Sequence, residues 1–224
     1  MGSGMSKKYF MAFLLIILII VASTTFTIKN LLNMHSNAKE IAQTWVPNLQ
    51  LMGWINGAVS DIPSIVLRLT LENNPQEMSR IENEELKPLL KEIEEKLEIY
   101  EEHYISNSEE ADLYAYFEKN WHEYLDKLPT TLEAGKEKKY DITNRQIKVA
   151  YPIWYEANDT INKIIIYNNK KSQRASQSSF NLFEYTIILI LFSNLFTILL
   201  IVIIVLWTSS NEFRELINLM RKKE

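Results

Sequence analysis

The sequence predicts an all-α fold, a membrane-anchored antiparallel four-helix bundle whose first and last helices continue into two transmembrane helices. Three observations predict it. Two long uncharged apolar stretches lie near the ends of the 224-residue chain. Apolar residues recur at helical seam spacing between them, and only three short breaks interrupt that spacing. Four helices, each with one apolar seam, bury their seams most simply as an antiparallel bundle.

The apolar stretches are residues 9–28 and 185–207, which hold 20 and 23 residues without a charge. An α-helix needs about 20 residues to cross a hydrocarbon core of about 30 Å, so each stretch is predicted to be a transmembrane helix. The alternative for the first stretch is a cleaved signal peptide with "VAS" as its cleavage site. The apolar run continues past that site to Ile28, which favours a span.

Basic residues predict the topology of a two-pass protein of the cell membrane. Lys7 and Lys8 precede the first span, and Arg214 and three basic residues at 221–223 follow the second. The positive-inside rule therefore places both termini, residues 5–8 and 208–224, in the cytoplasm. Residues 29–184 are then extracytoplasmic. The leading "MGSG", residues 1–4, is expected to be a cloning remnant.

The composition of residues 29–184 excludes several classes of partner and chemistry. This region has 18 Lys and Arg against 25 Asp and Glu, and an acidic surface disfavours nucleic acid and anionic lipid. The chain has no cysteine, which excludes disulfides, thiol catalysis and zinc-cysteine sites.

Three breaks divide residues 29–184 into four helices. In "NNP", Asn74 is predicted to cap a helix that has Pro75 at its first position. In "SNSEEAD", Ser106 and Glu109 have the spacing of a capping box. In "EAGKEKKYD", Gly135 is expected to adopt the left-handed conformation that ends a helix.

Each of the four helices shows one apolar seam, and no turn signal separates the first and fourth helices from the adjacent spans. The seams, in chain order, are Met52, Ile55, Val59, Ile62, Val66 and Leu69; Leu86, Leu90, Ile93, Leu97, Tyr100 and Tyr104; Tyr114, Phe117, Trp121, Tyr124 and Leu128; and Ile147, Ala150, Trp154, Ala157, Ile161 and Ile164.

Five prolines, at positions 47, 63, 88, 129 and 152, fall inside these helical patterns. A proline in a helix removes one backbone hydrogen bond and tends to bend the helix. One interpretation is that they are bends that wrap long helices around a core. The other is that Pro63 and Pro152 open space between the first and fourth helices.

Two segments resemble the four-helix-bundle sensor domain of methyl-accepting chemotaxis receptors: "WVPNLQLMGWINGAVSDI" in the first helix and "AYPIWYEANDTINKIIIYNNKKSQRAS" in the fourth. The order of span, bundle and span extends the resemblance over residues 5–210. It implies a homodimeric sensor without a cofactor. The closing "NEFRELINLMRKKE" resembles the start of a HAMP relay helix, so residues 208–224 are expected to be its truncated beginning, with the cytoplasmic signalling module missing from this chain.

One candidate ligand-binding face lies on the first helix. Trp54, Asp61 and Arg68 are seven residues apart and share a face beside the seam. The family commonly has an arginine after its Asp-apolar pair, whereas Pro63 stands there in this chain, so Arg68 is the nearest substitute. Arginine beside an aromatic ring can hold an anionic ligand. The alternative is a solvated face on which Arg68 pairs with Glu72.

A second candidate face lies on the fourth helix, where Tyr151, Tyr155 and Asn158, with Asn162, form a polar aromatic strip. The alternative is that these aromatic side chains belong to a helix interface.

No catalytic or metal motif is evident. The histidines at 35, 103 and 122 lack metal-ligand spacing, and there is no glycine-rich phosphate loop or nucleophile motif. The sequence therefore predicts a non-enzymatic sensor of a small molecule of unknown identity. The alternatives are the sensor of a histidine kinase or cyclase, and a membrane-anchored structural or adaptor protein.

Overall fold

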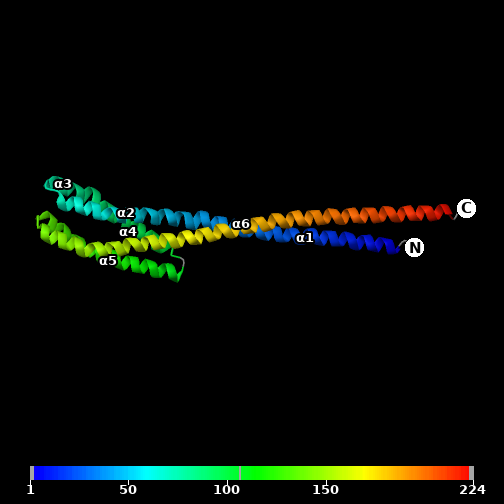
Figure 1. The fold of residues 1–224 in the computed structure, drawn as a ribbon, viewed down its shortest axis with the longest axis horizontal. Coiled ribbons are helices and arrows are strands. Elements are labelled where there is room, and N and C mark those ends of the chain that lie inside the picture. Colours follow the sequence, from blue (N-terminus) through cyan, green and yellow to red (C-terminus); the bar gives the residue numbers. More distant parts are fainter. Residues whose placement is uncertain (1–2, 106, 222–224) are drawn as a thin grey trace. The chain divides into compact units, whose positions relative to one another are not determined.

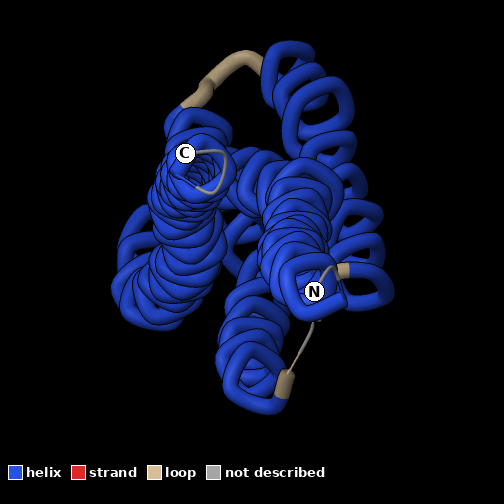
Figure 2. Tube along the Cα trace, turned by 90° about the vertical axis from the view of Figure 1, so that its right-hand side faces the viewer, coloured by secondary structure: helices blue, strands red, loops and turns tan. Residues whose placement is uncertain are grey.

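The computed structural model describes residues 3–105 and 107–221, and all the regular structure in these ranges is helical. Figure 2 shows the trace as helices joined by short connections. The elements are α1 (Ser3–Glu40), η1 (Ile41–Trp45), α2 (Val46–Leu71), α3 (Pro75–Arg80), η2 (Ile81–Leu86), α4 (Lys87–His103), α5 (Ser108–Lys136) and α6 (Tyr140–Arg221), where η marks a π-helical segment. The predicted all-α class is confirmed.

The chain divides into two compact units, and both boundaries fall within a helix. Lys39–Arg174 forms one unit, called the bundle below. The described parts of Met1–Ala38 and Ala175–Glu224 form the other, called the paired apolar helices. The boundaries lie inside α1 and α6, which are both unbroken there. The first and last helices therefore continue from the bundle into the apolar stretches, as the sequence predicts.

The bundle has the four predicted helical arms. The first is η1 with α2, the second is α3, η2 and α4, the third is α5, and the fourth is the first part of α6. α2 packs against both α4 and α5 (Figure 1). The turns that follow α2 and α5 lie at one end of the bundle, and the link from α4 to α5 lies at the other (Figure 1).

The predicted seams form the core. All six seam residues of the first arm and all five of the third are buried. A row of neighbouring aromatic rings, with centroids 5.4–6.3 Å apart, runs along α4 and α5: Tyr104, Tyr100, Tyr114, Phe117, Trp121 and Tyr124. Such ring pairs stabilise a fold by more than the burial of their apolar area alone. In the other two seams, Leu90, Tyr104 and Trp154 are partly buried and pack against the core, and Ile147 is partly buried outside it. The seam spacing therefore located most of the core.

Two of the five prolines follow π-helical segments. Pro47 comes two residues after η1 and Pro88 two residues after η2. A proline has no N–H and its ring clashes with the carbonyl four residues earlier; the wider π turn accommodates this. In η2 the buried Ile81 and Leu86 are five residues apart, a step that a regular helix would place on different faces. The other three prolines lie inside α2, α5 and α6.

The helix ends confirm one sequence prediction and correct two. Asn74 caps α3, since its Oδ1 accepts the Gln76 N–H at 2.9 Å. The cap of α5 is Asn107, whose Oδ1 accepts the Glu110 N–H at 3.1 Å. The predicted capping box is therefore wrong at its cap position, and Ser106 lies outside the described residues.

Gly135 does not end α5 as predicted. It is a buried helical residue, and α5 continues to Lys136. The left-handed residue is Lys138, with φ 60°. Its N–H donates to Gly135 O and the Lys139 N–H to Ala134 O, both at 3.0 Å, which is the hydrogen-bond pattern of a Schellman ending. Lys138 Nζ also donates to Glu72 O, a bond that ties this turn to the end of α2.

Gly135 serves helix packing instead. A Cβ atom placed there would lie 2.7 Å from Thr70 Cγ2 and 3.0 Å from Thr70 Cα. The absence of a side chain therefore lets the last turn of α5 approach the last turn of α2.

The paired apolar helices expose apolar side chains along both members, from Phe10 to Leu32 and from Phe180 to Trp207. Both helices are long and apolar enough to cross a membrane. A buried polar contact joins them. Asn30 Nδ2 donates to Thr186 Oγ1 at 2.9 Å, and that hydroxyl donates to Leu182 O at 2.6 Å.

Candidate functional site

A ladder of small polar side chains, exposed at Ser60 and part-buried at Asn56, joins α2 to α6 of the bundle. Ser60 Oγ donates to Asn56 O of its own helix at 2.7 Å and lies 2.9 Å from Asn158 Oδ1. One turn away, Asn56 Nδ2 donates to Asn162 Oδ1 at 3.2 Å. Asn158, predicted as a ligand residue, therefore lies at a helix contact. The ladder favours one register of α2 against α6, because a shift of either helix would break both contacts.

A third bond in this interface depends on a proline. In a regular helix the carbonyl of Val59 would accept the N–H of residue 63, but Pro63 has none. The indole of Trp154 replaces it, because Trp154 Nε1 donates to Val59 O at 2.9 Å. A backbone acceptor that α2 leaves unpaired is thus satisfied by α6, as buried carbonyls generally require.

A cavity of about 250 Å³ lies beside this bond. Its walls come from α2, α5 and α6 and are mostly apolar: Pro63, Ser64, Val66, Leu67, Tyr124, Leu128, Thr131, Ile147, Ala150, Tyr151 and Trp154. Pro63 is part of the lining, as the hypothesis of proline-opened space expects. Pro152 is not, although its neighbour Tyr151 is.

The predicted face of α2 is accessible, but two of its three residues are already engaged. Lys96 Nζ of α4 lies 4.5 Å from the centroid of the Trp54 ring, a cation–π contact. Arg68 is half exposed and forms an ion pair with Glu85 of η2. Asp61 is exposed and forms no ion pair within the described ranges.

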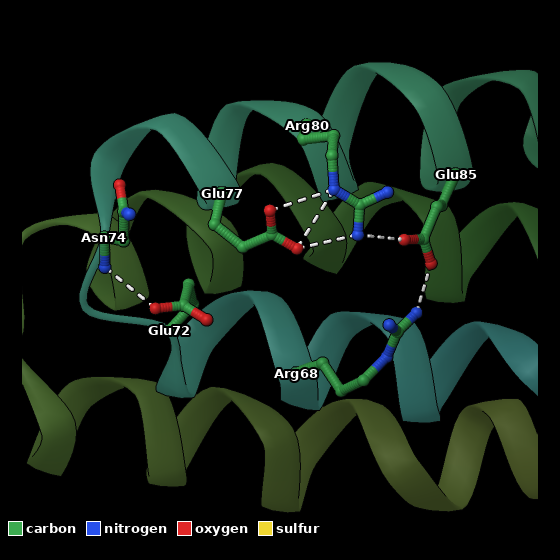
Figure 3. A network of polar contacts seen from close by, with 6 residues as sticks. All are labelled: Arg68, Glu72, Asn74, Glu77, Arg80 and Glu85. Carbon is green, nitrogen blue, oxygen red and sulfur yellow. Dashed lines mark hydrogen bonds and ion pairs between the residues drawn. The ribbon is translucent and has the colours of Figure 1, made fainter.

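The expected pairing of Arg68 with Glu72 is wrong. Glu72 Oε1 instead accepts the backbone N–H groups of Asn73 and Asn74, at 2.7 and 2.8 Å. Those bonds hold it at the α2–α3 turn, so Arg68 pairs across to η2 (Figure 3).

Figure 3 shows Glu85 shared by two arginines, Arg68 from α2 and Arg80 from α3. Arg80 also binds Glu77, with its Nη2 2.7 Å from Glu77 Oε1. The hydrogen bond from Arg68 lowers the pKa of Glu85, and that from Arg80 lowers the pKa of Glu77, so both carboxylates are held in the charged form. An anionic ligand at Arg68 would have to displace Glu85.

The residues of the predicted strip on α6 lie in different environments. Tyr151 lines the cavity, and its ring lies 5.3 Å from that of Trp154. Tyr155 is exposed, and Asn158 contacts Ser60. Within the described ranges no hydrogen bond or ion pair joins this strip to Trp54, Asp61 or Arg68, so the two predicted faces do not form one site.

Sequence reasoning missed a buried polar cluster near the α4–α5 link. Tyr100 Oη donates to Glu110 Oε1 at 2.6 Å, and Asn168 Nδ2 contacts Tyr100 Oη at 3.2 Å and Asn48 Oδ1 at 3.1 Å. Burial, then the bond to Glu110, raises the pKa of Tyr100. The signal was present, because Asn48 and Asn168 stand where the first and fourth seams extend by one more turn.

No group of three or more potential metal ligands gathers in the part of the chain that the structure describes.

Comparison with known proteins identifies the class. The model of a four-helix-bundle sensory module for signal transduction matches residues 3–183. The chain therefore belongs to this family, the sensory modules of chemotaxis receptors. No curated protein and no solved structure matches the chain.

Proposed function

We propose that this chain is the sensory and membrane-spanning part of a chemotaxis receptor, which binds a small extracellular solute and transmits a helix displacement to a cytoplasmic signalling module. The observation that carries the proposal is the combination of family and connectivity. The chain belongs to the chemotaxis sensory modules, and the first and last arms of its bundle continue into helices apolar enough to span a membrane.

Membrane insertion is supported by the surface of the paired apolar helices. Their exposed side chains are mostly aliphatic and aromatic, a large apolar surface of the kind that marks membrane contact. In the proposed topology residues 9–28 and 185–207 span the membrane, both termini are cytoplasmic, and residues 29–184 are extracytoplasmic. Residues 208–224 would begin the relay to the signalling module.

Transmission is supported by two features of α6. It is helical without a break from Tyr140 to Arg221, so a displacement of its bundle part can be passed along its axis. Within the bundle it contacts α2 through the Asn56–Asn162 hydrogen bond and the Ser60–Asn158 contact. Displacements of about 1–2 Å are within the known range of helix shifts. We propose a homodimer without a cofactor or enzymatic activity.

The face of Trp54, Asp61 and Arg68 and the strip of Tyr151, Tyr155 and Asn158 remain proposed binding surfaces. Arg68 is half exposed, which leaves it reachable by a carboxylate that exchanges with Glu85. Tyr151 also lines the cavity, which makes it the strip residue best placed to touch a solute.

A fusion protein tests the proposed function. A complete relay and signalling coil would be joined after Trp207, in each of the helical registers, and kinase output recorded against a broad panel of solutes. We expect at least one fusion to respond to an external solute. The histidine-kinase and cyclase alternatives would be favoured if only fusions to those modules responded, and silence in all registers with every output module would support an adaptor role.

A further inference from the structure

The cavity between α2, α5 and α6 is distinct from the exposed face on which Arg68 lies. It opens where Pro63 interrupts the hydrogen bonds of α2 and where Trp154 of α6 supplies the missing donor. Both residues line it. The position of the cavity is therefore set by Pro63, the same residue that leaves Val59 O free to accept the hydrogen bond from Trp154 of α6.

The side chains that line the cavity disfavour a charged ligand. No Asp, Glu, Lys, Arg or His is among the lining residues, so an ion would enter without a counter-ion, at a high desolvation cost. Most of the wall is aliphatic or aromatic, as is usual for small-molecule pockets. The occupant that fits is uncharged and largely apolar.

Three lining residues, Ser64, Tyr124 and Tyr151, have hydroxyls that make no hydrogen bond within the described ranges, and only Tyr124 of the three is a buried residue. Tyr124 is 3% exposed, and within the described ranges its hydroxyl makes no hydrogen bond, whereas the hydroxyl of Thr131 donates to Lys127 O at 2.8 Å. Burial raises the pKa of Tyr124, so its hydroxyl stays protonated and able to donate. The hydroxyl therefore has a proton to donate, and an occupant with an acceptor atom would pair with it.

The volume limits the size of the occupant. A cavity of about 150 Å³ can hold benzene, and this one measures about 250 Å³. It therefore has room for one ring with a short substituent and is small for a ligand of two fused or linked rings.

We infer that this cavity binds an uncharged single-ring molecule that carries a hydrogen-bond acceptor, and that Tyr124 donates to that acceptor. This rests on the proposed function in one respect, since it names the ligand class of the proposed sensor. Such a ligand would touch α2, α5 and α6 together, and would thus act on the interface that the Trp154–Val59 bond and the polar ladder hold in register.

Direct binding by the full chain in lipid nanodiscs tests the inference, with empty nanodiscs as the blank for partitioning. Three probes of similar size separate the contributions: acetophenone has a ring and an acceptor, ethylbenzene has no acceptor, and benzoate has a charge. We expect calorimetric titration to show saturable binding of acetophenone, weaker binding of ethylbenzene and none of benzoate.

Variants locate the binding. Tyr124→Phe should weaken the binding of acetophenone about two- to tenfold, because one neutral hydrogen bond is lost. The affinity for ethylbenzene should not change. Tyr114→Phe is the matched control: it is equally buried on α5, but its hydroxyl donates to Leu97 O, so both probes should bind as before. Ser64→Phe, from an exposed position on the cavity wall, should block both.

Each outcome decides between the two proposals. Saturable acetophenone binding that Ser64→Phe leaves intact, or preference for benzoate, would overturn the inference. Binding that follows the expected pattern while no fusion signals would support the cavity site and count against the sensor function. Fusions that respond to solutes while acetophenone does not bind would leave the sensor function standing and reject this ligand class.

Discussion

At the scale of single residues, two helical glycines have opposite surroundings. Gly135 of α5 faces Thr70 so closely that a Cβ atom would lie 2.7 Å from Thr70 Cγ2. Gly53 of α2 has no atom within 4 Å of the same position. Both residues are glycine, but packing requires a glycine only at position 135.

Alanine at each glycine tests this difference. Gly135→Ala should lower the free energy of unfolding by about 1–2 kcal/mol, because overpacking against Thr70 outweighs the better helix propensity of alanine. Gly53→Ala should raise it by about 0.5–1 kcal/mol through propensity alone. Urea unfolding of the full chain in micelles, followed by circular dichroism, measures both. Equal effects of the two substitutions would contradict the packing role.

At the scale of helical elements, the α2–α6 contact combines a defect in one helix with a donor from the other. Pro63 leaves Val59 O unpaired within α2, and Trp154 Nε1 pairs it. The two residues should therefore be energetically coupled, although they are 91 positions apart.

A double-mutant cycle measures that coupling. Trp154→Phe should cost about 1–3 kcal/mol in the native chain, because Val59 O is then unpaired in a partly buried interface. In the Pro63→Ala background residue 63 has an N–H that can reach Val59 O, so the same change should cost less, by about 1 kcal/mol. Unfolding free energies that add within about 0.5 kcal/mol would show that the indole bond does not depend on the proline.

The same elements show what the sequence could predict. Seam spacing placed most of the buried apolar residues of the four arms, because burial follows the helical period, although Ile147 and Trp154 of the fourth arm are only partly buried. It could not place Lys138 or Asn107, because turn geometry depends on how the flanking helices meet. Nor could it find the partner of Arg68: local spacing favoured Glu72, but two backbone N–H groups at the turn hold that carboxylate.

The candidate site was predictable only in part. Helical spacing placed Tyr151 on a candidate strip, and it lines the cavity. Tyr124 was assigned wholly to the core seam, but it is both a core residue and a cavity wall. Cavities arise from three-helix contacts, and a pattern within one helix contains no information on what the other two contribute.

At the scale of the whole molecule, the proposed topology can be tested because the chain has no native cysteine. A cysteine at Gln76, exposed on α3, should be labelled by a membrane-impermeant thiol reagent in intact cells. A cysteine at Ser209, exposed beyond the second apolar stretch, should be labelled only after permeabilisation. The reverse labelling pattern would contradict the topology.

The π-helical segment η2 has a consequence for how the family can vary in length. Ile81 and Leu86 are five residues apart, as are Arg80 and Glu85, which form an ion pair. Deletion of one residue between them would make each spacing four, which a regular α-helix also places on one face. The remaining obstacle is Pro88, whose ring a regular turn would bring against a carbonyl. We therefore expect relatives that are one residue shorter here to lack the proline as well, so that a gap within residues 82–84 and a substitution at position 88 would be inherited together.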